Sequence, residues 1–193
     1  MRLKILNSGY GFGAKVLFAF IQAVSRQPVP DAAKLVFYRP DFYGAPMKEF
    51  THEAMRGPSA WSVGDRELMA AFVSKMNECE FCIGAHTATA ARAYQDEGKV
   101  SAVLSDLETA SIEEPLRATL RMLGKLTREH AVNGDDMRAV LAAGVSREQI
   151  EDALAVCWAF NTTNRLADAF GFFVLGPKAF EAGAKFLLKR GYR

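Results

Sequence analysis

Cysteine is scarce in this sequence of 193 residues, which contains three: Cys79, Cys82 and Cys157. Secreted proteins held together by disulfides carry an even and denser set, so this small odd number indicates a reducing compartment. We therefore predict a cytoplasmic protein without a disulfide framework.

Long hydrophobic runs are also missing. No stretch reaches the roughly 20 apolar residues that a membrane-spanning helix needs. The apolar stretch 16–24 is interrupted by Gln22, and no A-x-A cleavage site precedes Arg26, so the pattern is not that of a signal peptide. We interpret residues 14–26 as an ordinary packed helix and expect no membrane partner.

Charge of one sign is not in excess, because 24 Lys and Arg side chains are balanced by 22 Asp and Glu side chains, for a net charge of +2. Proteins that bind the phosphate backbone of nucleic acids usually carry a basic patch, and no basic run interleaved with aromatic residues occurs here. We expect no nucleic-acid partner.

Alternating β-strand patterns are rare, whereas apolar residues recur at helical steps of three and four. Ser146 and Gln149 form a capping-box pattern, which predicts the start of a long helix that runs to about Phe173. The other predicted helices cover residues 14–26, 31–38, 44–57, 63–77, 115–130, 135–144 and the segment after Gly176-Pro177. The predicted fold class is all-α. We expect one helical domain over residues 1–193, made of segments 1–62, 63–97 and 98–193.

Residues 79–86 read CEFCIGAH, with two cysteines three apart and a histidine four residues after the second. Residues three and four apart share one face of a helix, so Cys79, Cys82 and His86 are predicted to lie together. Asn77 is a candidate N-cap, which places both cysteines in the first turns, where free N–H groups favour a thiolate. A thiol pair with a neighbouring base has the parts of a reactive dithiol.

Three other interpretations of this motif remain open. The two thiols could be inert core residues that have this spacing by chance. The motif could supply three zinc ligands, but the remaining candidates form no second ligand pair: Cys157, His52 and His130. His86 could also be a satisfied core histidine beside a dithiol that works alone.

Residues 66–90, RELMAAFVSKMNECEFCIGAHTATA, resemble the signature of the alkylhydroperoxidase D-type proteins in the carboxymuconolactone decarboxylase-like superfamily. That signature is a glutamate followed by C-x-x-C and a histidine, and the residues that match its spacing are Glu67, Cys79, Cys82 and His86. The flanking segments resemble the peroxidase-related branch of the superfamily: residues 38–46, 56–68 and 160–172.

The resemblance implies an all-helical fold, homo-oligomers of three or six subunits, and reduction of hydroperoxides without haem, flavin, metal or another cofactor. It implies that Cys82 attacks the peroxide and becomes a sulfenic acid, with which Cys79 condenses to a disulfide. An external thiol or dithiol would then reduce the disulfide. Glu67 and His86 would form the proton relay.

Glu67 can join the site only on one condition. Twelve residues separate it from Cys79, which places the two about 120° apart on a continuous helix. The chain must therefore bend near Asn77-Glu78, or Glu67 must act through water. Otherwise Glu67 is a solvated glutamate or one that complements the helix dipole.

Phe81 departs from the best-known members of the family, which carry a histidine at this position beside the second cysteine. One thiol-activating group is therefore missing. We expect slower peroxide reduction, or a role in disulfide exchange or sensing.

A polar stripe lies at helical spacing on the long C-terminal helix: Asn161, Asn164, Arg165 and Asp168. A buried stripe must satisfy its own hydrogen bonds, and Arg165 can pair with Asp168. We interpret the stripe as a structural network, with substrate binding or positioning of the site as the alternative. Cys157 is expected in the core. His52 and His130 are expected at the surface or at helix ends, without partners.

The sequence thus predicts a thiol-dependent hydroperoxide reductase. Two other classes of function remain open. Lactone decarboxylation gives the superfamily its name, although that reaction has no use for a redox pair of cysteines. The other class is a non-catalytic oligomeric scaffold or a zinc-binding module.

Overall fold

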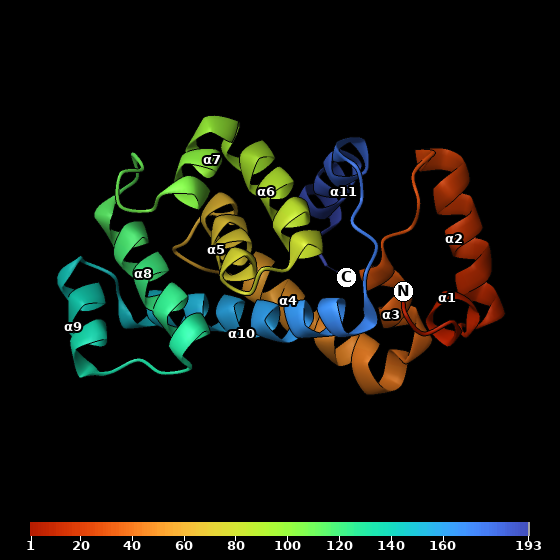
Figure 1. Ribbon diagram of the computed structural model, residues 1–193, viewed down its shortest axis with the longest axis horizontal. Helices are drawn as coiled ribbons and strands as arrows, with labels where there is room; N and C mark the ends of the chain where they lie inside the picture. The colour runs from red at the N-terminus through yellow and green to blue at the C-terminus, as the bar shows by residue number, and fades with distance from the viewer. Residues whose placement is uncertain (193) are drawn as a thin grey trace.

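Helices make up the regular structure of residues 1–192, which is the part of the chain that the computed structural model describes (Figure 1). No strand occurs in this part, so the all-α prediction is confirmed. In chain order the elements are α1 (Ile5–Ser8), α2 (Phe12–Ser25), α3 (Asp31–Tyr38), the π-helix η1 (Pro40–Gly44), α4 (Ala45–Arg56), α5 (Val63–Met76), α6 (Glu80–Tyr94), α7 (Glu97–Ser105), α8 (Glu114–Glu129), α9 (Gly134–Ala142), α10 (Arg147–Phe170) and α11 (Pro177–Arg190).

Side-chain caps set the starts of the central helices. The predicted capping box begins α10: the Gln149 N–H donates to Ser146 Oγ at 3.2 Å, and the Ser146 N–H donates to Gln149 Oε1 at 3.0 Å. Ser62 and Asp65 form the same arrangement at the start of α5. α10 ends at Gly171, whose φ of 61° is left-handed, so the helix stops a few residues before the predicted end.

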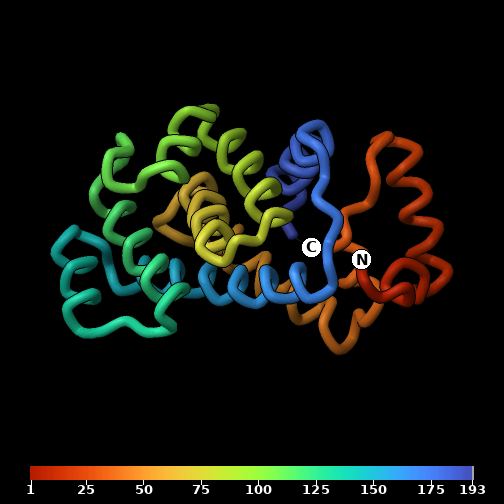
Figure 2. The backbone as a smooth tube through the Cα atoms, viewed as in Figure 1, coloured from red at the N-terminus to blue at the C-terminus, as the bar shows by residue number. Residues whose placement is uncertain are grey.

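Helix α10 organises the molecule. It runs along the lower edge of Figure 1 and packs against α4, α5 and α8. The tube in Figure 2 leaves the red N-terminal helices, reaches α9 at the opposite end and returns along α10. Helices α5 and α6 form an antiparallel pair on top of it, and α11 packs against α6. The helices that carry the predicted site therefore lie at the centre of the fold.

Close packing of α11 on α6 depends on Gly84. A side-chain carbon at this position would lie 2.4 Å from the ring of Phe180, which is closer than real carbon atoms approach. The absence of a side chain lets the two helices meet just beyond the cysteine motif.

Two hydrophobic clusters fill the interior. The larger one lies between α4, α5, α8 and α10, and its most enclosed side chains include Leu68, Met69, Leu120, Leu123 and Phe160. Burying a side chain of this size contributes about 1.5–3 kcal/mol relative to exposure. The smaller cluster surrounds the cysteine motif and consists of Leu6, Leu35, Cys79, Phe81, Cys82, Ala167, Phe172, Leu175 and Ala179.

Helix α2 departs from the predicted packed helix over residues 14–26. Only Phe18 is buried, in edge-to-face contact with Phe37 at 5.2 Å between ring centroids. Phe12 is 83% exposed and Val24 is 69% exposed. Apolar residues surround most of this helix, but only the side that carries Phe18 meets the rest of the chain, so the prediction of ordinary packing is wrong. No helix within residues 1–192 has the length and apolar character needed to cross a membrane.

Candidate active site

The turn between α5 and α6 places the first cysteine. Asn77 ends α5 as its C-cap, and Glu78 adopts a left-handed conformation with φ of 57°. The Cys79 N–H donates to the Ser74 carbonyl at 3.0 Å, which closes the turn. Cys79 is therefore the N-cap of α6, with a φ of −86° and a ψ of 92°. The predicted N-cap role of Asn77 is wrong, because the left-handed residue ends one helix before the next begins.

The two thiols of the motif are free and enclosed. Cys79 is 0% exposed and Cys82 is 1% exposed. Since Cys79 precedes the helix, only Cys82 and His86 share the predicted helical face, one turn apart on α6. Cys79 lies beside Cys82 because the N-cap residue folds back toward the first turn of its helix.

The pKa values of the two thiols are shifted in opposite directions. A hydrogen bond between the sulfur atoms lowers the pKa of Cys79, and the Cys82 N–H adds to this effect, although burial opposes it. The same hydrogen bond and burial raise the pKa of Cys82 well above its ordinary value. Cys79 is therefore the thiol of the pair that ionises more readily, with the Cys82 thiol as its hydrogen-bond donor.

Glu67 reaches the site because the chain reverses at Asn77 and Glu78. The carboxylate is 0% exposed, and its Oε2 lies 2.8 Å from Nδ1 of His86. The condition derived from the helical spacing is thus met, and the alternative of a solvated Glu67 is wrong. His86 is 5% exposed, and its ring packs edge to face on Phe160 at 4.3 Å between centroids.

Two residues that the sequence did not predict hold the other oxygen of Glu67. Arg56 Nη2 donates to Oε1 at 2.6 Å, and the Tyr192 hydroxyl donates to the same atom at 2.9 Å. Burial raises the pKa of Glu67, but the hydrogen bonds and charges of His86 and Arg56 outweigh it, so the pKa lies below the ordinary value. Burial and the charge of Glu67 raise the pKa of Tyr192, so its phenol stays neutral.

The cysteines and the Glu67–His86 pair are neighbours rather than one hydrogen-bonded chain. Among the described residues no hydrogen bond joins His86 to either thiol, so a proton can pass between them only through a substrate or a water molecule. Nor do three His, Cys, Asp or Glu side chains within residues 1–192 gather in a way that could hold a metal ion. The zinc interpretation therefore finds no ligand set in this arrangement.

Comparison with known proteins finds one matching family model. Residues 40–125 match the model of the carboxymuconolactone decarboxylase family, and this span contains the cysteine motif, Glu67, His86 and Arg56. The match supports a resemblance of this part of the chain to the carboxymuconolactone decarboxylase family. The predicted family resemblance is confirmed. None of the curated proteins compared with the chain matches it.

Two solved structures share the fold. One is described as an uncharacterized peroxidase-related protein from Silicibacter sp. TM1040; it is 22% identical, the match covers 93% of each chain, and the TM-score is 0.78. The other, from Ralstonia eutropha JMP134, is described as an alkylhydroperoxidase AhpD core and an uncharacterized peroxidase-related protein. It is 23% identical over 93% of each chain, with a TM-score of 0.75. The predicted alkylhydroperoxidase D-like helical fold is therefore confirmed.

The polar stripe on α10 forms a network with the turn before Cys79. Asn161 Oδ1 accepts from Asn77 Nδ2 at 3.1 Å and from Arg165 Nη1 at 3.0 Å. Asn164 Oδ1 accepts from the Ser74 hydroxyl at 3.1 Å. These contacts agree with the interpretation of the stripe as a structural network.

Asp168 has a different environment from the rest of the stripe. The expected pairing with Arg165 is wrong, because Arg165 donates to the carbonyl and side chain of Asn161 one turn earlier. The exposed Asp168 carboxylate instead acts on the dithiol and raises the pKa of both Cys79 and Cys82. The negative charge of Asp168 therefore opposes ionisation of both thiols.

The remaining cysteine and histidines are accounted for separately. Cys157 is 1% exposed, and burial raises the pKa of its thiol, which confirms it as a core residue. His130 caps the C-terminal end of α8 with a φ of 59°, as expected of a helix-end residue. The expectation that His52 has no partner is wrong, since the Tyr192 N–H donates to its Nδ1 at 3.2 Å.

Phe81, which stands where better-known members carry histidine, is an aromatic packing residue here. Its ring contacts Phe172 and Phe180 edge to face, at 5.3 Å and 6.2 Å between centroids. It is 7% exposed. These rings belong to the same hydrophobic cluster as the two thiols.

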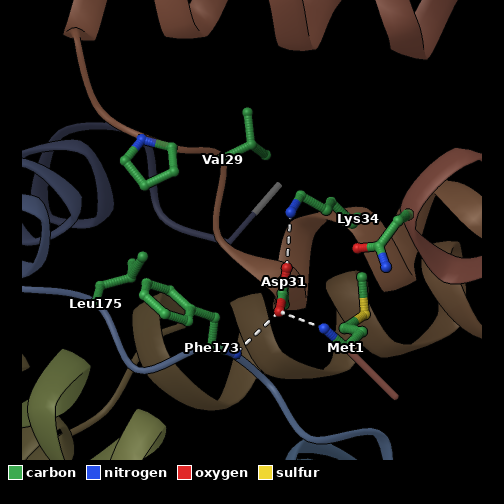
Figure 3. A pocket seen from close by; sticks show the side chains of 8 residues that line it. Met1, Val29, Asp31, Lys34, Phe173 and Leu175 are labelled. Atoms are coloured by element: carbon green, nitrogen blue, oxygen red, sulfur yellow. Dashed lines mark hydrogen bonds and ion pairs between the residues drawn. The ribbon is translucent and has the colours of Figure 1, made fainter. Parts of the chain in front are cut away.

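A cavity of about 230 Å³ lies on the N-terminal side of this cluster (Figure 3). The buried Asp31 lies at its edge, where its carboxylate accepts from Lys34 Nζ at 2.8 Å and from the Phe173 N–H at 2.9 Å. Leu175 lines the cavity and also packs in the cluster around the cysteines. The cavity is separate from the relay, because neither Glu67 nor His86 lines it.

Proposed function

We propose that this protein reduces hydroperoxides with the Cys79–Cys82 dithiol and is regenerated by an external thiol or dithiol. The observation that carries the proposal is the pair of hydrogen-bonded thiols at the start of α6, with a buried carboxylate–histidine pair one turn further along. A redox reaction needs two thiols and a route for protons, and a structural core needs neither.

The proposed cycle begins when the Cys79 thiol loses its proton, which is later taken up by the departing oxygen. The Cys82 thiol then gives its proton to the Cys79 thiolate across their hydrogen bond, and the Cys82 thiolate attacks one oxygen of the peroxide. The O–O bond breaks, Cys82 becomes a sulfenic acid, and the departing oxygen takes a proton and leaves as an alcohol or water.

The second step closes the disulfide. Cys79 loses its proton and attacks the Cys82 sulfur, the S–O bond breaks, and the hydroxide takes up a proton to become water. The fully protonated dithiol thus supplies two electrons and two protons to each peroxide. An external dithiol then restores the pair by thiol–disulfide exchange.

His86 carries protons in this proposal. Glu67 accepts the proton on Nδ1, so Nε2 is the ring nitrogen free to take a proton from a thiol and return it to the departing oxygen. Since neither thiol bonds to His86 directly, the peroxide or a water molecule completes the path.

The oligomer and the compartment remain proposals of the same kind. We expect a homo-oligomer of three or six subunits from the family resemblance. A cytoplasmic location follows from the sparse cysteines and would keep the thiols reduced between cycles.

Steady-state consumption of cumene hydroperoxide in the presence of excess dithiothreitol tests the proposal. We expect catalytic consumption that is lost after the thiols are alkylated in unfolding buffer and the protein is refolded, or more simply in the Cys79→Ser, Cys82→Ser double variant. Consumption by that double variant at the wild-type rate would overturn the proposal. Decarboxylation of a muconolactone by the double variant would favour the lactone reaction instead.

A further inference from the structure

The Glu67 carboxylate is a charged group with no access to solvent, and three side chains divide its two oxygens among them. Oε2 faces only His86, whereas Oε1 accepts from both Arg56 and Tyr192. An ionised carboxylate at 0% exposure requires a compensating charge and a full set of donors. Neither Arg56 nor Tyr192 belongs to the glutamate, C-x-x-C and histidine pattern.

We propose that Arg56 and Tyr192 are positioning residues that keep Glu67 ionised and aimed at His86, so that the imidazole holds its proton on Nδ1 and presents Nε2 as the base. Their importance for peroxide reduction rests on the proposed function. Their control of the His86 tautomer does not, and it can be measured in a protein that has no activity.

Arg56 is itself held in place from two sides. Its Nη1 donates to the Met55 carbonyl at 2.8 Å, and its Nη2 also donates to the Leu187 carbonyl at 3.2 Å. The guanidinium carbon lies 5.1 Å from the centre of the Tyr192 ring. The end of α4 and the end of α11 therefore fix one cation beside Oε1 of Glu67.

Tyr192 reaches the site because the chain turns sharply after α11. Gly191 has a φ of 69°, and a side-chain carbon there would lie 2.6 Å from the His52 ring, so the turn favours glycine. The Tyr192 N–H donates to His52 Nδ1, and the Tyr192 ring lies nearly parallel to the His86 ring at 6.4 Å. The hydroxyl is thereby directed at Oε1 of Glu67.

Few charged groups surround the Glu67–His86 pair, so the groups that can affect its protonation can be named individually. The charged or titratable groups that face the Glu67–His86 pair are Arg56 from α4, Arg66 from α5, and Tyr192 after α11, whose N–H is bonded by His52 from α4. Helix α10 contributes the apolar Phe160 against His86. Asp65 and Asp152 act on Arg66, whose Nη1 donates to the Gly57 carbonyl at 2.9 Å. Arg56 is thus the cation that bonds Glu67 directly.

The tautomer of His86 is the first readout. The chain has three histidines, so the side-chain nitrogen signals of ¹⁵N-labelled protein can be assigned with a His86→Gln variant. Wild type is expected to show a protonated Nδ1 and an unprotonated Nε2 at neutral pH. In Arg56→Met and Tyr192→Phe the Nε2-protonated form should become populated, most in Arg56→Met. Arg138→Met, at an exposed arginine, and Tyr10→Phe, at a half-buried tyrosine of the N-terminal segment, should leave the signals unchanged.

The pH profile of peroxide-driven disulfide formation is the second readout. Removing the guanidinium raises the pKa of Glu67, so the acid limb of the profile should move to higher pH in Arg56→Met. Arg56→Lys should restore the limb but only part of the rate, because lysine keeps the charge and loses the second bond. Tyr192→Phe should lower the rate about tenfold, the usual effect of losing a hydrogen bond to a charged group.

The outcomes separate this inference from the proposed function. If wild type oxidises no thiol with peroxide but the tautomer shifts as described, the proposed function fails and the positioning role stands. If the folded Tyr192→Phe protein keeps the wild-type tautomer and rate, and the folded Arg56→Lys protein keeps the full wild-type rate, the two residues are structural only and the inference is overturned. These conservative variants decide the matter even if Arg56→Met does not fold.

Discussion

Glu67 and His86 are nineteen residues apart in the chain, yet Oε2 of one lies 2.8 Å from Nδ1 of the other. The contact exists because α5 and α6 are joined by a turn with a left-handed Glu78, which brings the middle of one helix against the middle of the next. The same turn leaves Cys79 at the cap of α6. One local reversal therefore builds both the thiol pair and the carboxylate–histidine pair.

The two cysteines should fail in different ways when each is replaced by serine. Cys82→Ser should abolish thiol-dependent peroxide consumption, because it removes the attacking sulfur. Cys79→Ser should still react once and then stop, because the sulfenic acid on Cys82 has no partner thiol. Mass spectrometry after trapping with dimedone should find the adduct on Cys82 in the second variant. An adduct on Cys79 of the Cys82→Ser protein, with none on Cys82 of the other, would reverse the two roles.

Glu67→Gln should destabilise the protein by about 3–5 kcal/mol, because it leaves the Arg56 cation enclosed without its anion. Urea unfolding at neutral pH measures this. Glu108→Gln is a matched control, since Glu108 also pairs with an arginine but is 58% exposed, and its loss should cost less than about 1 kcal/mol. Equal effects of the two substitutions would contradict the buried ion pair.

Acidification should remove the stability that Glu67 provides. The pKa of Glu67 in the folded protein lies below its unfolded value, so its contribution is complete above about pH 4.3 and is lost as the pH falls through the folded pKa. The difference in unfolding free energy between wild type and Glu67→Gln should therefore be constant near neutral pH and shrink below pH 4. A difference that grows on acidification would show that the carboxyl is protonated in the native protein.

Asp168→Asn should increase the fraction of thiolate in the dithiol. The Asp168 carboxylate raises the pKa of both Cys79 and Cys82, so the neutral amide should move the thiolate titration to lower pH. Ultraviolet absorbance of the thiolate as a function of pH measures the shift. Asp106→Asn is the control, because that carboxylate bonds Thr109 on an exposed loop. No shift in Asp168→Asn would remove Asp168 from the dithiol environment.

Phe81→His restores the residue that better-known members carry, and we expect faster disulfide formation with peroxide because an imidazole beside the thiols favours the thiolate. The loss of ring contacts with Phe172 and Phe180 should cost about 1–3 kcal/mol of stability. Phe81→Leu should show a similar loss of stability without the gain in rate. If both variants react equally fast, the gain comes from looser packing and not from the imidazole.

The sequence revealed the parts of this site that follow local periodicity. The spacing of Cys79, Cys82 and His86 and the capping box at Ser146 were sufficient to predict a helical dithiol motif on an all-α fold. The sequence predicted that Glu67 joins the site only if the chain bends before Cys79. Helical geometry gives the direction of a side chain on one helix, but it does not say at which residue that helix ends. In the structure the left-handed Glu78 ends α5 before α6 begins, so the N-cap of α6 is Cys79 and not Asn77.

Arg56 and Tyr192 lay beyond such reasoning. The Tyr192 hydroxyl bonds Glu67 across 125 positions of sequence, and no periodic pattern reports a contact of that range. The exposed apolar faces of α2 were missed for a related reason, since composition shows that a helix is apolar but not how many of its sides the fold covers. Both the Tyr192–Glu67 contact and the exposure of α2 depend on packing between segments far apart in the sequence.

The most direct test of the account is a thiol titration of the reduced, unfolded protein before and after one equivalent of hydroperoxide has reacted with the native protein. We predict that the three titratable thiols fall to one, that the remaining thiol is Cys157, and that dithiothreitol restores all three. Three unreacted thiols after exposure to hydroperoxide would contradict a redox function for the Cys79–Cys82 pair.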